Sequence, residues 1–287
     1  MGSNKLINWL FETNAVRVCP ENKPFWYTSC KIGPYYINTH FLYGSEAKAN
    51  ELLKVIDVCK EDKVNCSEVI MELVSVNYHK DAIFKGLIDS MCDYIKEKIG
   101  LSNIDYISGG ERRDWFFSFM IAKLLDKPHI TVFKDLSVML YKDGVSEGLK
   151  SIEGAKVLHV ADIITEASSY VRAWIPAIEA IGGQLKYSLV VVDRLQGGGE
   201  KLAAANVESH ALVNVDKTMF DLALESEHIT SLQHDMLMKY LDNPHDTMRE
   251  FLLNNPNFLR DALEADQRTA ERAKTCIEED LYSLKNV

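Results

Sequence analysis

The 287-residue sequence lacks the short motifs that most directly identify a function. It has no GxxxxGK[ST] phosphate loop, no GxGxxG dinucleotide motif and no HExxH zinc motif, so nothing supports those three chemistries. No apolar run reaches the length of about 18 residues that a membrane span needs, and the N-terminus shows no signal-peptide core. We therefore expect a cytoplasmic protein with no membrane partner.

The sequence has few cysteines, and its basic residues are outnumbered by acidic ones. The six cysteines form no CxxC pair, which predicts reduced thiols rather than a disulfide framework or a zinc site. The eight histidines show no metal-ligand spacing, and His159, inside an apolar stretch, is expected to be a hydrogen-bonded core residue. The net charge of −10 repels polyanions, so nucleic acid is not an expected partner. A small phosphate ligand remains compatible, because local backbone amides can oppose the overall field.

The sequence does contain a regular alternation of apolar runs and helical segments between residues 101 and 216. Strands are predicted at 104–108, 129–133, 156–161, 186–193 and 210–216, and helices at 114–126 and 168–183. Nearly continuous apolar strands separated by helices are typical of a parallel sheet that is buried on both faces. The predicted fold class is therefore α/β, with a doubly wound parallel sheet.

The regions on either side of this core have other patterns. The region before the core is rich in aromatic residues around Gly33. After it, helical periodicity predicts one helix that begins at Ser45 and a second helix at 81–100, and the type of the apolar stretch at 67–76 is ambiguous. The last region predicts three or four helices that either cover the core or form a dimer surface. We therefore expect three segments: an N-terminal hairpin and helix hood at 1–100, a core at 101–216 and a helical C-terminal extension at 217–287.

Ligands of open α/β sheets bind beyond the carboxyl ends of the strands. The turns that follow predicted strands here are 108–114, 134–135, 161–169 and 193–201. They supply several cations, which suit an anionic small molecule: Arg112, Arg113, Lys134, Arg194 and Lys201. The alternative, that these are ordinary solvated loop charges, stays open for each of them.

The stretch VLHVADIITEASS, residues 157–169, is the most informative of these turns. It joins an apolar strand, one acid at the strand end and a hydroxylic turn at the start of a helix. Asp162 is suited to accept protons from sugar hydroxyls. Thr165, Ser168 and Ser169, at a helix N-terminus, are suited to hold a sugar 5′-phosphate.

At these residues the chain resembles the type I phosphoribosyltransferases, and the orotate phosphoribosyltransferases in particular. The resemblance runs from about Pro24 to Asp216 and rests on ordered segments: YTSCKIGPYYIN, SGGERRDWFF, VFKD, VLHVADIITEASS and VVVDRLQGG. It implies a type I phosphoribosyltransferase-like fold and a pentosyl transferase of pyrimidine nucleotide metabolism. Such an enzyme joins orotate or a related base to phosphoribosyl pyrophosphate (PRPP), with Mg²⁺ as cofactor, and forms a homodimer.

The resemblance also implies a role for each candidate residue. Asp162 would be catalytic, together with Lys142, which lies in the segment that resembles the family's mobile loop. PRPP would be bound by Asp162, Thr165, Ser168, Ser169, Arg113 and Lys134. Arg194 would bind the base.

Some positions depart from the family pattern. Ala161 stands where the family has its first acid, and Glu166 and Ala167 stand where it has small residues, the second usually glycine. These departures keep two alternatives open: a non-catalytic PRPP- or nucleotide-binding relative with a degenerate site, and a transferase for another base. A Glu166 side chain that points away from the turn would favour a working sugar-phosphate site.

Overall fold

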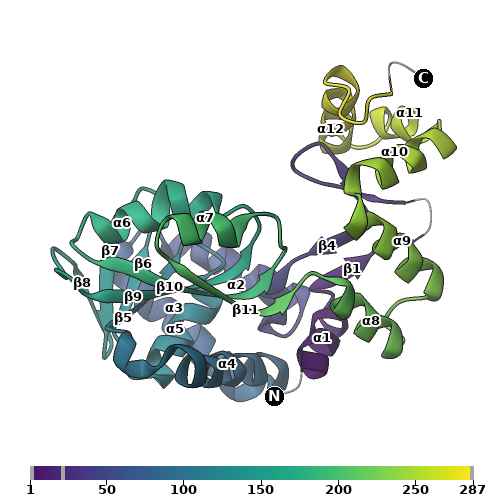
Figure 1. Ribbon diagram of the computed structural model, residues 1–287. Coiled ribbons are helices and arrows are strands. Elements are labelled where there is room, and N and C mark those ends of the chain that lie inside the picture. Colours follow the sequence, from purple (N-terminus) through teal and green to yellow (C-terminus); the bar gives the residue numbers. More distant parts are fainter. Residues whose placement is uncertain (1–2, 21–22, 285–287) are drawn as a thin grey trace. The chain divides into compact units, whose positions relative to one another are not determined.

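A computed structural model describes residues 3–20 and 23–284, and the chain divides into two units (Figure 1). Unit 1 consists of Met1–Ala15 and Thr39–Val215, and unit 2 consists of Val16–Asn38 and Asp216–Val287. These units do not follow the three predicted segments. The helices of the predicted hood pack with the core, whereas its aromatic hairpin packs with the C-terminal helices.

A seven-stranded sheet forms the centre of unit 1, in the order β11-β10-β9-β5-β6-β7-β8. Five adjacent strands are parallel: β5 (Tyr106–Gly110), β6 (His129–Val132), β9 (Lys156–Ile164), β10 (Gln184–Asp193) and β11 (Glu208–Asn214). An antiparallel hairpin extends one edge, made of β7 (Val138–Lys142) and β8 (Val145–Gly148). The predicted parallel core is therefore confirmed.

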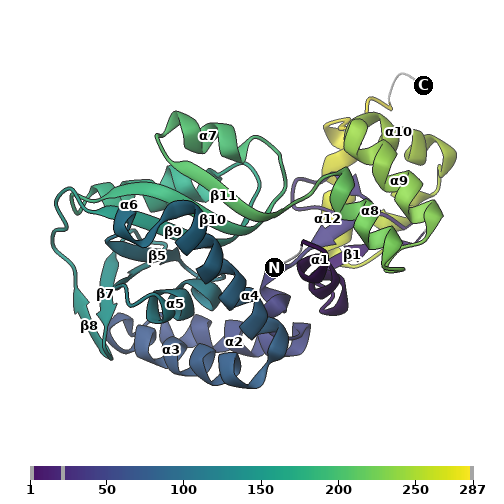
Figure 2. The ribbon, with the colours of Figure 1, turned by 60° about the horizontal axis from the view of Figure 1, so that its bottom comes forward.

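Helices cover both faces of this sheet, as a doubly wound fold requires (Figures 1 and 2). One face carries α3 (Lys63–Lys80), α4 (Ala82–Tyr94) and α5 (Trp115–Leu124), and the other carries α6 (Ile175–Glu179) and α7 (Gly198–Ala204). The ambiguous stretch at 67–76 is part of α3. Unit 1 also contains α1 (Ser3–Glu12), η1 (Thr39–Tyr43), α2 (Glu46–Cys59), η2 (Ile95–Ile99) and η3 (Leu101–Asn103).

Local sequence signals account for several helix ends. Ser45 caps α2, because its Oγ accepts the N–H of Lys48 at 3.2 Å. Gly100 follows the π-helical turn after α4 with a φ of +84°, as expected of a terminating glycine. The helix predicted at 168–183 contains a π-helical turn, η4 (Tyr170–Trp174), directly before α6. Pro176 lies at the start of α6 and lacks the N–H of a regular α-helical bond, which fits this wider turn.

Unit 2 contains two small antiparallel sheets and a helical region. β1 (Val16–Val18) pairs with β4 (Tyr35–Ile37), and β2 (Phe25–Trp26) pairs with β3 (Ile32–Gly33). Between residues 216 and 284 the structure has five helices rather than the three or four predicted: α8 (Lys217–Glu225), α9 (Ser231–Asp242), α10 (Pro244–Asn254), α11 (Phe258–Leu263) and α12 (Gln267–Glu278). Across residues 3–20 and 23–284, no helix has the length and apolar character of a membrane span.

Contacts within unit 2 explain why the hairpin joins the C-terminal helices. The Ile32 N–H donates to the hydroxyl of Tyr282 at 2.9 Å, and Trp26 stacks on Phe258 with ring centroids 5.9 Å apart. Strands of two or three residues cannot bury their own aromatic side chains. The helices supply that apolar surface, although they are more than 200 residues away in the sequence.

Candidate active site

The candidate site lies at the carboxyl ends of β5 and β9, which are neighbours in the sheet. β5 continues into a turn at 111–114 before α5, and β9 continues into a turn at 165–167 before a helix that begins at Ser168. β6 lies on one side of this strand pair, and β10 and β11 lie on the other. Such a reversal of strand order is the switch point at which open α/β sheets form a ligand-binding crevice.

Asp114 links these two strand ends. Its Oδ2 accepts the N–H of Gly110 and its Oδ1 accepts the N–H of Asp162, both at 3.1 Å. Fully buried His159 places Nε2 3.3 Å from Asp114 Oδ2 and Nδ1 2.9 Å from Ser108 Oγ, so it is the hydrogen-bonded core residue expected. This linking role of Asp114 could not be predicted from the sequence, because the two backbone N–H groups that it joins, of Gly110 and Asp162, lie 52 residues apart.

Asp162 is the buried carboxyl group at the end of β9. Its Oδ2 accepts the Thr39 hydroxyl at 3.0 Å, and its Oδ1 accepts the N–H of Ile163 at 2.8 Å. Burial, followed by the nearby charge of Asp114, raises the pKa of Asp162 to about 7, and Arg113 and the Thr39 hydrogen bond oppose this rise. A carboxyl group that is close to half protonated at neutral pH can either donate to or accept from a sugar hydroxyl.

The turn after β9 presents backbone N–H groups at the start of a helix. Ala167 has a φ of +52°, so the turn does adopt the left-handed conformation at the position where the family pattern has glycine. Ser169 makes no capping hydrogen bond. In the described part of the chain, no turn or cap bond uses the N–H groups of 166–169. Unpaired N–H groups at a helix start suit an anion.

The side chain of Glu166 is directed toward solvent and toward α7 rather than into this turn. It is 62% exposed, and its Oε2 lies 3.5 Å from Lys201 Nζ. The ion pair places a positive charge beside the carboxylate. The obstacle that Glu166 posed to phosphate binding is therefore removed by its direction.

Ala161 does not face the crevice. Its side chain is 2% exposed and belongs to a buried hydrophobic cluster that includes Ile164 and Val190. Because neighbouring residues of a strand point to opposite faces, Asp162 and Ala161 cannot both project from the same side of β9. The position of the family's first acid is therefore part of the apolar core in this chain.

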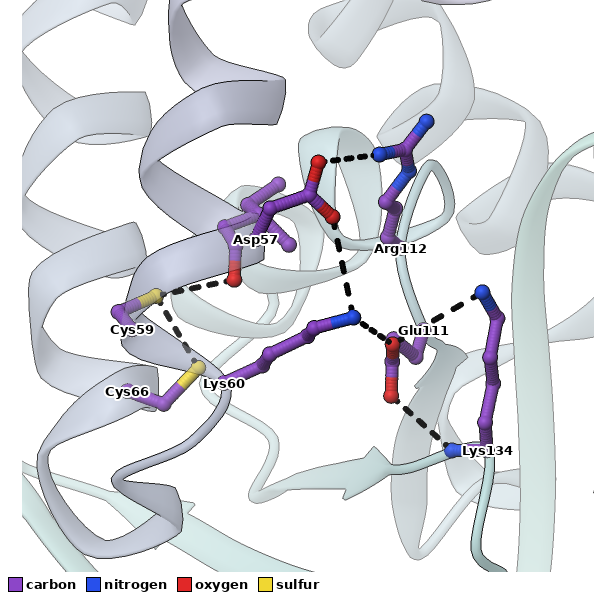
Figure 3. A network of polar contacts seen from close by, with 8 residues as sticks. Asp57, Cys59, Lys60, Cys66, Glu111, Arg112 and Lys134 are labelled. Atoms are coloured by element: carbon purple, nitrogen blue, oxygen red, sulfur yellow. Dashed lines mark hydrogen bonds and ion pairs between the residues drawn. The ribbon is translucent and has the colours of Figure 1, made fainter.

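Acids neutralise much of the positive charge near the loop that follows β5 (Figure 3). Arg112 pairs with Asp57, and Lys60 Nζ lies 3.1 Å from Glu111 Oε1. The backbone N–H of Lys134 donates to Glu111 Oε2 at 3.1 Å, and its Nζ lies 3.9 Å from Oε1. The Glu111 side chain is only 6% exposed. We call these five residues the Glu111 clamp: Asp57, Lys60, Glu111, Arg112 and Lys134. The loop residues Glu111 and Arg112 are thus held by the end of α2 and by Lys134 after β6.

Arg113 is the cation of this loop that remains available for an anion. In residues 3–20 and 23–284, no carboxylate lies within ion-pairing distance of it. The positive charge of Arg113 acts to lower the pKa of Asp162. It also contributes at His40, where burial, followed by Arg113 and Arg112, lowers the pKa to about 3. His40 is therefore neutral, and the positive potential at this strand end comes from arginine.

Arg194 lies beside the turn that follows β9. It follows β10, and its backbone N–H donates to the carbonyl oxygen of Ile164 at 3.0 Å. Since Ile164 is followed directly by Thr165, the structure brings the predicted base-binding residue next to the predicted phosphate-binding turn.

Lys142 is not brought to these residues. It ends β7, which runs antiparallel to β6, and the preceding Tyr141 pairs with His129 at the start of β6. The sheet register then puts Lys142 level with Val157, five residues before Asp162, which corresponds to about 16 Å of strand. Within one chain, Lys142 therefore lies at the wrong end of the sheet for the catalytic role predicted.

Comparison with known proteins gives the site a context. No family model matches the chain. The orotate phosphoribosyltransferase of Sulfolobus acidocaldarius is 26% identical over 176 residues, which cover 61% of this chain and 84% of that protein. The orotate phosphoribosyltransferase of Rhodopirellula baltica is 37% identical over 62 residues, 22% of this chain and 32% of that protein.

This chain is similar to the orotate phosphoribosyltransferases. The solved structure of Leishmania donovani UMP synthase matches it with a TM-score of 0.54 and 17% identity, over 84% of this chain and 42% of that chain. That likeness concerns the fold alone. The type I phosphoribosyltransferase-like fold predicted for this chain is thus confirmed.

Proposed function

We propose that the protein transfers the phosphoribosyl group of PRPP to orotate or a related pyrimidine-like base and releases pyrophosphate. The observation that carries this proposal is the juxtaposition of Asp162 and an open, uncapped helix start at the switch point of the sheet. The turn is unobstructed because Glu166 is paired with Lys201. The similarity to orotate phosphoribosyltransferases supports the choice of base.

The reaction breaks the bond between ribose C1 and the pyrophosphate oxygen and forms a bond between C1 and a ring nitrogen. Positive charge develops on the ribose, so catalysis depends on holding the groups in line and stabilising charge. Asp162 would hold the ribose hydroxyls. The other proposed contacts are the 5′-phosphate with Thr165, Ser168 and Ser169, the pyrophosphate with Arg113 and Lys134, and the base with Arg194.

The donor set is compatible with Mg²⁺ as cofactor. The carboxylate of Asp162 and the oxygens of PRPP are hard donors, which this cation prefers. Among the residues that the structure describes, no group of three or more His, Cys, Asp or Glu side chains is arranged to hold a metal by itself. We therefore propose that the substrate supplies most of the ligands, and that bound Mg²⁺ would neutralise charge on the departing pyrophosphate.

We also propose a cytoplasmic homodimer. Lys142 lies on the edge hairpin, too far from Asp162 of its own chain to act there. In the resembling family, active sites often receive a loop from the neighbouring subunit. A dimer would allow Lys142 to serve the site of a second copy.

The test is an assay of the purified protein with PRPP, Mg²⁺ and orotate, or another pyrimidine-like base, that follows pyrophosphate release. We expect turnover, and a loss of about 100-fold or more in Asp162→Asn. Asp93→Asn, which changes an exposed carboxylate on α4, is the matched control and should keep full activity. PRPP binding without turnover of any base would instead support a non-catalytic binding relative, and absence of PRPP binding would refute both.

A further inference from the structure

Two thiols lie in contact beside the Glu111 clamp (Figure 3). Cys59 is the last residue of α2, and its Sγ lies 3.3 Å from Sγ of Cys66, in the first turn of α3. Cys66 is fully buried, whereas Cys59 is partly exposed. A disulfide has an S–S distance of about 2.05 Å, so the two sulfur atoms need to approach by about 1.2 Å to form one.

The segment that carries Cys59 also carries two members of the Glu111 clamp. Asp57 pairs with Arg112, and Lys60 pairs with Glu111, so one clamp residue follows Cys59 directly and the other lies two positions before it. A shift of the last turn of α2 therefore changes the contacts that hold the loop after β5.

We propose that Cys59 and Cys66 form a reversible disulfide, and that this modification site controls the Glu111 clamp. The oxidant is hydrogen peroxide. The Cys59 thiol is oxidised to a sulfenic acid as the O–O bond breaks and water leaves. The Cys66 thiol then attacks the sulfenic sulfur, the S–S bond forms and a second water leaves. A small thiol reverses the reaction by exchange.

The two cysteines differ in the way that this sequence of steps requires. The hydrogen bond with Cys66 lowers the pKa of Cys59, and the same contact, followed by burial, raises the pKa of Cys66. A partly exposed thiol of lowered pKa is the one that reacts with peroxide, and a buried neighbour is suited to resolve the product. By contrast, burial raises the pKa of Cys92 to about 12.

Oxidation is expected to weaken the clamp. As the sulfur atoms approach, the end of α2 moves toward α3, and the Lys60 ammonium moves with it. Glu111 then loses a partner that lies 3.1 Å away in the reduced protein. With Lys134 as its remaining cationic partner, the Glu111 carboxylate would repel pyrophosphate more strongly, and we expect about fivefold weaker binding. This consequence for binding rests on the proposed function.

The first test is a peptide map of the full chain after hydrogen peroxide treatment and alkylation of the remaining free thiols. Trypsin cleaves after Lys60 and Lys63, so the two cysteines fall in separate peptides, 55–60 and 64–80. We expect these peptides to be linked until dithiothreitol is added. The link should vanish in Cys66→Ser and persist in Cys92→Ser. Separate peptides in the oxidised wild-type protein would overturn the proposal.

The second test needs no ligand. Amide hydrogen exchange across residues 108–114 should be about threefold faster or more in the oxidised protein, because loop contacts are lost. In Cys66→Ser, peroxide should have no such effect. Unchanged exchange in the linked wild-type protein would overturn control of the clamp. If reduced protein fails to bind pyrophosphate, the proposed function fails, whereas the peptide map and the exchange still decide the disulfide and its effect.

Discussion

Replacing Asp162 with asparagine is expected to stabilise the fold at neutral to basic pH while it removes sugar-phosphate binding. Asp162 is 6% exposed, and burial raises the pKa of its carboxyl group from 3.8 to about 7. Asparagine is neutral at every pH. Its amide can retain both hydrogen bonds, with an oxygen for the N–H of Ile163 and an NH₂ group for the hydroxyl of Thr39.

The size of the effect follows from proton linkage. The folded protein binds the Asp162 proton more tightly than the unfolded chain, so the contribution of this group to stability is most favourable below pH 4, declines between about pH 4 and 7, and is level above that. Each pKa unit corresponds to about 1.4 kcal/mol, which gives an upper limit of about 4 kcal/mol for this carboxyl group. We expect Asp162→Asn to gain about 2 to 4 kcal/mol at pH 8 and a smaller amount, about 1 to 2 kcal/mol, at pH 5.

Urea unfolding at both pH values measures this difference. Three of the four tryptophans, Trp9, Trp115 and Trp174, belong to unit 1, so their fluorescence reports on the unit that contains the site. Asp93→Asn should leave the free energy of unfolding within about 0.5 kcal/mol of the wild type. If Asp162→Asn is less stable than the wild type at pH 8, attraction to Arg113 outweighs the penalty of burial, and the reasoning fails.

Three further substitutions test the site. Gly110→Ala should lower the free energy of unfolding by about 2 kcal/mol in urea, because a Cβ there would lie 2.3 Å from the ring of Trp174; wild-type stability would contradict this packing. Ala161→Asp should lose about 3 kcal/mol or more in the same assay and gain no PRPP affinity, since the new charge would be buried in the core. A gain in affinity would show that position 161 faces the crevice. Glu166→Ala should change PRPP affinity, measured by calorimetry, less than about threefold, because the carboxylate is exposed and paired with Lys201; a tenfold gain would place it in the phosphate turn.

Local patterns in the sequence were sufficient to identify most elements of the core. Apolar runs, helical periodicity, and the cap at Ser45 and stop at Gly100 predicted the five parallel strands and the helices α2, α4, α5 and α6 of unit 1, because these signals depend on neighbouring residues. They left α3 ambiguous and did not predict α7 or β8. The turn at 165–169 was also predictable, since a strand end, an acid and a helix start follow one another directly. The number of C-terminal helices was underestimated, because Asn243 alone separates α9 from α10, and only three residues separate α10 from α11 and α11 from α12.

Which side chains meet across the fold was decided only by the tertiary structure. Asp114 bonds to Asp162, and Glu166 pairs with Lys201, over separations of 48 and 35 residues. The same holds for the placement of Lys142 at the far end of the sheet, which follows from the antiparallel turn after β6. Periodicity shows which face of an element is buried, but it does not show what that face packs against. The sequence therefore determined the framework and the turn at 165–169, and long-range packing decided which charges face that turn.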